Sequence, residues 1–228
     1  MIFSSLRLAV RQLPDPAFRG VLLRSLGVTL VVIVLLAFLL GFGISEIPST
    51  GQGWLDSLIG VVSGIGLFVI KLLLFPLILS AVIGLFLDDV AEAVEQRHYP
   101  KDAPGKPLNL MPSLLMSLRF LLVLLGINLL LAPLYLLLLF FPPLKFAVFF
   151  AVNGYLLSRE YFETVAARYV PRPEIDRLRR QHRGDLWLGG AVIVLLLTIP
   201  LVNLVVPMVA TAFMVHVFKR LQGRNPAS

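Results

Sequence analysis

Apolar residues fill four long stretches of the chain, and short polar segments separate them. The stretches cover residues 26–44, 58–87, 114–157 and 186–218. A helix of about 20 apolar residues crosses a hydrocarbon core of about 30 Å. The first two stretches are long enough for this, so the pattern predicts two long transmembrane helices. The second of them, at about 45 Å, must tilt or project beyond the core.

The two later stretches are each broken near the middle by proline, at residues 140–143 and 198–203, with Pro207 following. Irregular backbone at membrane depth is tolerated only where it is buried in protein or lines a wet cavity, so such breaks favour a transport pathway. Each half of the last stretch has about 14 residues, or roughly 21 Å, which predicts a hairpin that penetrates only partway. The limb before the first break is longer and contains Asn128 and Pro133, so a full crossing and return is also open there.

The N-terminal residues 2–13 have apolar positions at helical spacing with arginines on the other side. This pattern is typical of a short amphipathic helix that lies in the membrane interface. The apolar positions are Ile2, Phe3, Leu6, Val10 and Leu13. Pro14 ends this helix, and Asp15 is placed to cap the next one, with Pro16 at its first position.

The composition is outside the range of soluble domains, because 58% of the residues are hydrophobic and only 14% are charged. The sequence therefore predicts an all-α integral membrane protein with two long transmembrane helices, two proline-broken, partially penetrating helical hairpins and interfacial helices. We expect residues 1–228 to form a single membrane domain. The chain has no cysteine and its three histidines are too scattered for a metal site, so no cofactor is predicted.

Basic residues gather in the polar segments. Residues 1–24 hold four arginines, residues 158–185 hold seven, and residues 88–119 and the C-terminal tail are also basic. The positive-inside rule places these segments and both termini in the cytoplasm, provided that all copies insert the same way. One cluster should meet anionic lipid headgroups rather than nucleic acid, because it borders the membrane. Its members are Arg177, Arg179, Arg180 and Arg183.

Three blocks of the sequence stand out by their order and spacing. They are G-Y-L-L-S-R-E-Y-F-E at residues 154–163, I-P-L-V-N-L at residues 199–204 with Pro207 beyond it, and the turn at residues 16–19. With these blocks the chain resembles the CysZ family of bacterial sulfate permeases over nearly its whole length. The resemblance implies a homo-oligomer of the bacterial inner membrane that brings in sulfate for cysteine synthesis, with two long spanning helices and two inserted hairpins.

The resemblance also implies a place for sulfate. The family binds the anion at a turn of the form G-[IL]-R-R near the start of the first long helix. The matching residues in this sequence are Ala17, Phe18, Arg19 and Gly20. Two positions depart from the pattern, since alanine replaces the glycine and glycine replaces the second arginine.

Sulfate is a dianion with no proton to donate, so its site needs N–H donors and positive potential. A helix N-terminus with Arg19 supplies both, and Arg24, about one turn deeper, is a candidate second contact. If the Asp15 carboxylate caps the helix, it accepts from the same backbone N–H groups that would bind sulfate. Asp15 must then rotate away, or the site must rely mainly on Arg19. In the alternative interpretation, Arg19 and Arg24 only anchor the helix at the lipid headgroups.

Charged residues mark two further candidate positions. Asp88, Glu92 and Glu95 follow one another at i, i+4 and i+7 and share one helix face. The resemblance places Asp88 beside a pore, where it would pair with arginine; the alternative is a solvated acidic face. Arg159 and Glu160 would form an ion pair that fixes a hairpin, or would line the conduction route.

Polar residues inside the apolar stretches are candidates as well. Asn203 lies between Pro200 and Pro207, where its amide can bond backbone groups freed by the break; the alternative is a polar narrowing of a pore. Lys71 interrupts the second span and Lys145 follows the first proline break. Each of these lysines either faces protein or water beside an anion route, or snorkels to the interface.

These observations favour sulfate uptake through a pore built by several copies, with capture at Arg19. The competing hypothesis is a membrane scaffold or accessory subunit that supports another transporter. The sequence contains no Walker loop, dinucleotide fingerprint, paired catalytic carboxylates or nucleophile elbow, so no enzymatic activity is predicted.

Overall fold

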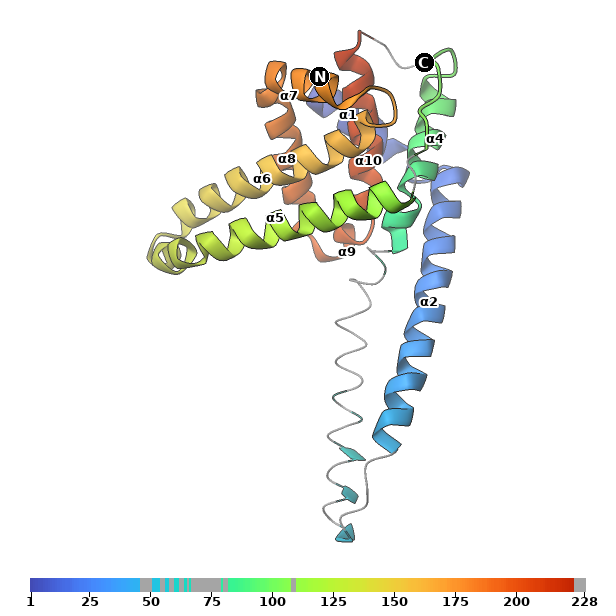
Figure 1. Ribbon diagram of the computed structural model, residues 1–228, viewed down its shortest axis with the longest axis vertical. Coiled ribbons are helices and arrows are strands. Elements are labelled where there is room, and N and C mark those ends of the chain that lie inside the picture. The colour runs from blue at the N-terminus through green and yellow to red at the C-terminus, as the bar shows by residue number, and fades with distance from the viewer. Residues whose placement is uncertain are drawn as a thin grey trace. The chain divides into compact units, whose positions relative to one another are not determined.

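In the computed structural model (Figure 1), the part of the chain that is described folds entirely into helices and connecting turns. The described residues are 1–45, 51–53, 56–57, 60–61, 64, 66, 79, 82–107 and 110–223. The all-helical fold class is therefore confirmed for these residues. Most of the second predicted span, residues 58–87, lies outside them, and so does Lys71.

The helices follow the order of the sequence, and proline or polar residues separate them. They are α1 (Ile2–Arg11), α2 (Pro16–Ser45), α4 (Leu87–His98), α5 (Leu110–Leu137), the 3-10 helix η1 (Leu138–Phe140), α6 (Pro142–Ala166), α7 (Arg172–Gln181), α8 (Arg183–Leu197), α9 (Pro200–Asn203) and α10 (Val206–Leu221). The chain divides into a larger unit, residues 1–18 with 87–228, and a smaller unit, residues 19–86.

Two helical segments in the described part are long and apolar enough to cross a membrane. One is Pro16–Leu36 in α2, and the other is Leu122–Phe140 in α5 and η1. The first belongs to the first predicted spanning helix, which begins at Pro16 as expected. The second lies in the limb before the first proline break, for which the sequence permits a full crossing. With 28 residues, α5 is about 42 Å long, so its length does not restrict it to partial penetration.

Prolines set most of the helix boundaries in the two broken stretches. Pro142 begins α6 after a bend at Phe141, Pro200 begins α9, and Pro207 lies in the first turn of α10. A proline at the start of a helix loses no hydrogen bond, because the first N–H groups of a helix have no partner within it. Pro133 is the exception, since it lies inside α5.

The core of the larger unit is built around α10, which contacts α1, α4, α6 and α8 (Figure 1). Every residue from Met208 to Lys219 is buried. The limbs α8 and α10 have 15 and 16 residues, or roughly 22 and 24 Å, so each is shorter than a hydrocarbon core. Partial penetration of this hairpin stays a prediction, but the structure adds that α10 meets protein along most of its length.

The closest helix packing is between α6 and α8. A Cβ atom on Gly190 would lie 1.8 Å from the carbonyl oxygen of Gly154, which no side chain can accommodate. Glycine is therefore required where the two backbones approach. This contact fixes the basic end of α6 next to α8 and α10.

The face that α1 turns toward the protein is not the apolar face that was expected to lie in the membrane interface. The buried positions are Ile2, Ser5, Ala9 and Gln12, whereas Phe3 is 79% exposed. Of these, Ser5 and Ala9 are small side chains, and α1 contacts α10, while the large apolar side chain of Phe3 points outward. The amphipathic pattern identified the helix correctly, but its most apolar positions do not form the packing face.

Candidate functional site

The turn predicted to bind sulfate is the first turn of α2. Phe18 points inward and is only 1% exposed, whereas Ala17 and Arg19 are exposed and Gly20 is half-buried. Within the described part of the chain, the Arg19 guanidinium has no hydrogen bond or ion pair. The backbone N–H groups of a first helical turn have no intrahelical acceptor, so they and Arg19 are suited to an anion.

Asp15 is held by the last turn of α4. Its carboxylate lies 2.5 Å from the Arg97 guanidinium, and its side chain is 13% exposed. Its backbone N–H donates to the carbonyl oxygen of Gln12 at 2.9 Å. Pairing with Arg97 reduces the repulsion that Asp15 would exert on an anion at the start of α2. The predicted conflict between the cap and the anion is thus relieved by an ion pair.

Arg24 does not share a face with Arg19. The two residues are five positions apart in a continuous helix, so their side chains leave the axis about 140° apart. We do not expect one small anion to contact both arginine side chains. The prediction of Arg24 as a second contact for the same sulfate is therefore not favoured by the helix geometry.

The acidic face of α4 gathers around one arginine that the sequence did not single out. The Arg168 guanidinium, which is almost fully buried, contacts Asp88 and also Glu95 at 3.1 Å. Glu95 accepts further hydrogen bonds from the Tyr169 hydroxyl at 2.5 Å and from the backbone N–H of Gly105 at 2.9 Å. Burial alone would lower the pKa of Arg168, but the two carboxylates raise it above its ordinary value. Arg168 therefore stays charged and ties α4 to the end of α6.

Glu92 is the member of that face that stays outside the cluster. It is exposed and accepts a hydrogen bond from the Gln96 amide at 3.0 Å. The three acids thus have two different surroundings, a buried arginine for Asp88 and Glu95 and solvent for Glu92. The sequence contained one signal for this cluster: Asp88 and Glu95 are seven positions apart and share one face of α4, which indicates that a basic residue packs against that face.

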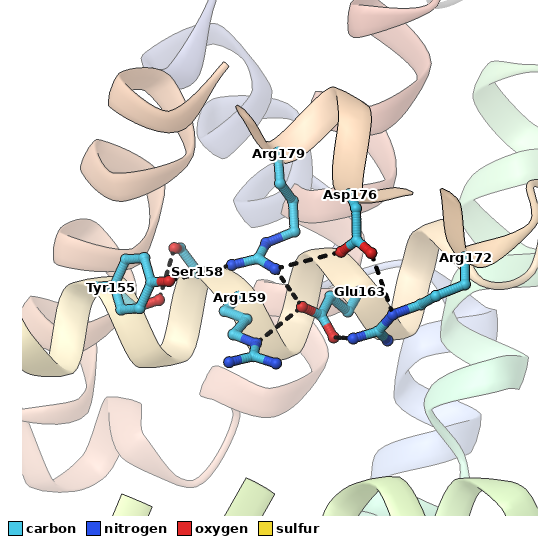
Figure 2. Close-up of polar contacts among 7 residues, drawn as sticks. All are labelled: Tyr155, Ser158, Arg159, Glu163, Arg172, Asp176 and Arg179. Atoms are coloured by element: carbon cyan, nitrogen blue, oxygen red, sulfur yellow. Dashed lines mark hydrogen bonds and ion pairs between the residues drawn. The ribbon is translucent and has the colours of Figure 1, made fainter. Parts of the chain in front are cut away.

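A second cluster, shown in Figure 2, surrounds Glu163 near the end of α6. Its buried carboxylate accepts from Arg159 Nε at 2.9 Å, Arg179 Nη1 at 2.6 Å and Arg172 Nη2 at 2.8 Å. Asp176 lies 3.8 Å from Arg179 and 4.0 Å from Arg172. These contacts hold α7 back against α6. Arg179 was expected to meet lipid headgroups, but it turns toward Glu163 and is 18% exposed.

The predicted pair of Arg159 with Glu160 is replaced by the pair of Arg159 with Glu163, one helical turn away. Adjacent residues on a helix point about 100° apart, whereas residues four apart face each other. Burial and the neighbouring Glu163 carboxylate raise the pKa of Glu160 to about 7, although Arg159 opposes the shift. Glu160 is therefore a carboxyl group that changes charge near neutral pH.

Asn203 ends the short helix α9. Its backbone N–H donates to the carbonyl oxygen of Ile199 at 2.8 Å. Within the described residues, its side-chain amide makes no hydrogen bond, so the expected bond to freed backbone groups is not formed by the amide. Lys145 lies in the first turn of α6 at the other proline break, where it is half-buried.

The basic end of α10 carries polar residues that sequence reasoning missed. Lys219 is 3% exposed, lies 3.2 Å from Asp102 and sits 4.6 Å from the centre of the Tyr169 ring. One turn earlier, the His216 ring nitrogen Nδ1 lies 2.9 Å from the Tyr99 hydroxyl. Asp102 and Tyr99 come from the segment after α4, 117 residues before their partners in α10, so no local pattern could reveal them.

The described part of the chain is thus all-helical, with two segments long and apolar enough to cross a membrane and with arginine clusters near the ends of α4, α6 and α7. A family model described as sulfate transporter CysZ/etoposide-induced protein 2.4 matches residues 5–207. The chain belongs to this family, and its resemblance to the CysZ family is confirmed. Among curated proteins, the comparison finds no match. The matched range contains both clusters and the first turn of α2, and it ends near the start of α10.

Proposed function

We propose that this protein is a sulfate permease of the bacterial inner membrane, which brings in sulfate for cysteine synthesis. The observation that supports the proposal is the family match over residues 5–207. The protein works as a transporter without catalytic chemistry or cofactors. Both termini lie in the cytoplasm, as the distribution of arginines predicts.

Sulfate is captured at the first turn of α2. The backbone N–H groups of Ala17 and Phe18 and the Arg19 guanidinium converge on the anion, and Gly20 leaves space beside it. The exposure of Arg19 and the pairing of Asp15 with Arg97 support this role. Arg24 acts separately, as a contact for lipid headgroups or for incoming anions.

The charged residues of α4 and α6 border the route of the anion. Asp88 and Glu92 lie at its mouth, where acids limit how tightly an anion is held. Arg159 and Glu160 offer a cation beside a carboxyl group whose pKa is near 7. Asn203 forms a polar narrowing at the proline break, where it ends the short helix α9.

The transport path is enclosed by several copies of the chain. Two broken hairpins from one protomer are too small to surround a wet pathway, so we infer a homo-oligomer in contact with membrane lipids.

The test is uptake of labelled sulfate into sealed proteoliposomes that contain only this protein. We expect uptake above that of empty vesicles, and we expect Arg19→Ala to lower it at least about tenfold, since a charge-assisted contact is worth roughly 1.5–3 kcal/mol. Arg11→Ala is the matched control, because Arg11 is also exposed and lies outside the proposed site. Oligomer size measured by chromatography must be the same for all variants.

Three results would change this proposal. Retained uptake in Arg19→Ala would keep transport and discard the capture site. Equal losses in both arginine variants would point to a general effect of positive charge. No uptake by well-folded protein would favour an accessory role beside another transporter.

A further inference from the structure

The Glu163 cluster holds more positive charge than its acids can neutralise. Arg159, Arg172 and Arg179 face two carboxylates, Glu163 and Asp176, and the contacts of Asp176 are the longer ones. Glu160, which interacts with both Arg159 and Glu163, adds only part of a negative charge at neutral pH, because burial and Glu163 raise its pKa to about 7. Part of one positive charge therefore remains uncompensated next to a buried carboxylate. A partly buried site screens charge less than open solvent does, so the surplus attracts an anion.

Donor groups of this cluster also remain unused. In the described part of the chain, Arg159 donates to Glu163 through Nε, and Figure 2 shows its two Nη atoms with no dashed contact. Arg179 uses Nη1 for Glu163, while its Nη2 donates to the Tyr155 hydroxyl at a long 3.5 Å. The Tyr155 hydroxyl accepts that bond, so its own proton is available to another acceptor.

The unused donors lie on one side of the cluster. Tyr155, Arg159 and Glu163 follow at intervals of four along α6, so their side chains emerge on one face of this helix. Arg179 comes from α7 and lies above the same face (Figure 2). The Tyr155, Arg159 and Arg179 side chains are exposed to 50%, 34% and 18%, so an anion can reach them from outside.

We propose that Arg159, Arg179 and Tyr155 form an oxyanion site, separate from the first turn of α2, for sulfate, phosphate or the phosphate of a lipid headgroup. Guanidinium groups suit this chemistry, because their planar N–H pairs match the oxygens of a tetrahedral anion. Glu163 positions both guanidinium groups by accepting from their inner edges and leaves their outer edges to the ligand. The site depends on oxyanion binding alone and does not require transport.

The first arm of the test measures binding of labelled sulfate and phosphate to purified full-length protein in lipid-free detergent by equilibrium dialysis. All variants carry Arg19→Ala, so the α2 turn does not contribute. We expect Tyr155→Phe to weaken binding about tenfold, because one hydrogen bond to a charged ligand is lost. Arg159→Lys should weaken binding at least as much, since lysine keeps the charge but loses the fork of donors. Arg180→Gln, which removes an exposed arginine of the same helix α7, should change affinity less than twofold.

The second arm identifies a lipid source. The protein is reconstituted in nanodiscs of phosphatidylglycerol or phosphatidylcholine and then released from them in the mass spectrometer. Native mass spectrometry counts the lipids that stay bound to the protein. Selective retention of phosphatidylglycerol that Tyr155→Phe loses assigns the site to a headgroup, whereas binding in the first arm alone assigns it to a free anion. The proposal is overturned if neither arm detects binding, or if Tyr155→Phe and Arg159→Lys bind like the Arg19→Ala parent. Tyr155→Phe removes one exposed hydroxyl, so failure to fold does not confuse the result.

Discussion

Helices α5 and α10 have nearly the same kind of sequence but opposite surroundings. Both consist mostly of apolar residues. Along α5, Leu129 and Leu130 are 75% and 79% exposed, whereas Phe213 and Met214 of α10 are fully buried. Apolar composition therefore states only that a helix avoids water. Whether lipid or protein covers it depends on what the rest of the chain places beside it.

Polar residues distinguish the two helices better than apolar ones do. In α5, the Asn128 amide donates to the carbonyl of Leu124 in its own helix at 2.9 Å and lies 3.4 Å from Asn153 of α6. In α10, His216 and Lys219 find partners from the segment that follows α4. An isolated helix can satisfy an asparagine internally, but a buried lysine needs an acid from elsewhere. The buried Lys219 near the end of α10 therefore indicates that protein surrounds this helix.

The largest expected difference comes from replacing glycine by alanine at a tightly packed helix contact and on the open surface of α5. Gly190→Ala would place a Cβ 1.8 Å from the Gly154 carbonyl oxygen, so we expect loss of folded protein. Gly126→Ala in α5 meets nothing within 4 Å and should be neutral or stabilising by up to about 1 kcal/mol, since alanine favours helix. Fluorescence-detected chromatography after membrane extraction measures both. Comparable yields from the two variants would contradict the close contact of α6 and α8.

Truncating one large side chain in each helix should give the next largest difference. Phe213→Ala leaves a cavity in the core around α10, and we expect a loss of about 3–5 kcal/mol. Leu130→Ala removes a side chain that is 79% exposed, and should cost well under 1 kcal/mol in a bilayer. Thermal unfolding midpoints in the same detergent make the comparison. An equal shift for the two variants would mean that α5 is also covered by protein.

A charge in α5 tests the lipid environment directly. Leu130 is highly exposed in a segment able to span a membrane, so Leu130→Arg should raise the cost of insertion by about 2.5–3.5 kcal/mol. A glycosylation-based insertion assay on residues 110–140 reports this cost. Leu130→Gln is the uncharged control and should be tolerated better. Equal insertion of the arginine and glutamine variants would show that this face of α5 meets water or protein.

Local signals explain the parts of the structure that were predictable. Pro16 begins a helix as expected, and Pro142 and Pro200 interrupt the apolar stretches as expected, each at the start of a new helix. Proline has these effects wherever it occurs, because it fixes its own backbone angle and lacks an N–H group. The start of α1 and the span in α2 likewise follow from residue spacing and the length of an apolar run.

The clusters required information that no local pattern contains. Arg168 meets Glu95 across 73 positions, and Arg179 meets Glu163 across 16. Seven arginines in one segment predicted a basic surface, but the fold turns Arg168 inward and leaves Arg180 outside. The carboxylates were visible as candidates, whereas the choice of cation for each depended on how α4, α6 and α7 pack.

A pH-dependent effect is expected at Glu160, between the buried cluster and the exposed surface. Its pKa is near 7 in the folded protein and about 4.5 when unfolded, so the folded state holds a proton that the unfolded state releases between these values. Stability should therefore fall as pH rises from about 5 to 7 and then level off. Glu160→Gln cannot titrate and should remove this slope in the unfolding midpoint. Glu174→Gln, at an exposed acid whose pKa is lowered by its bond to Arg177, should leave the slope unchanged in that range. A slope that persists in Glu160→Gln would assign the pH dependence to another group.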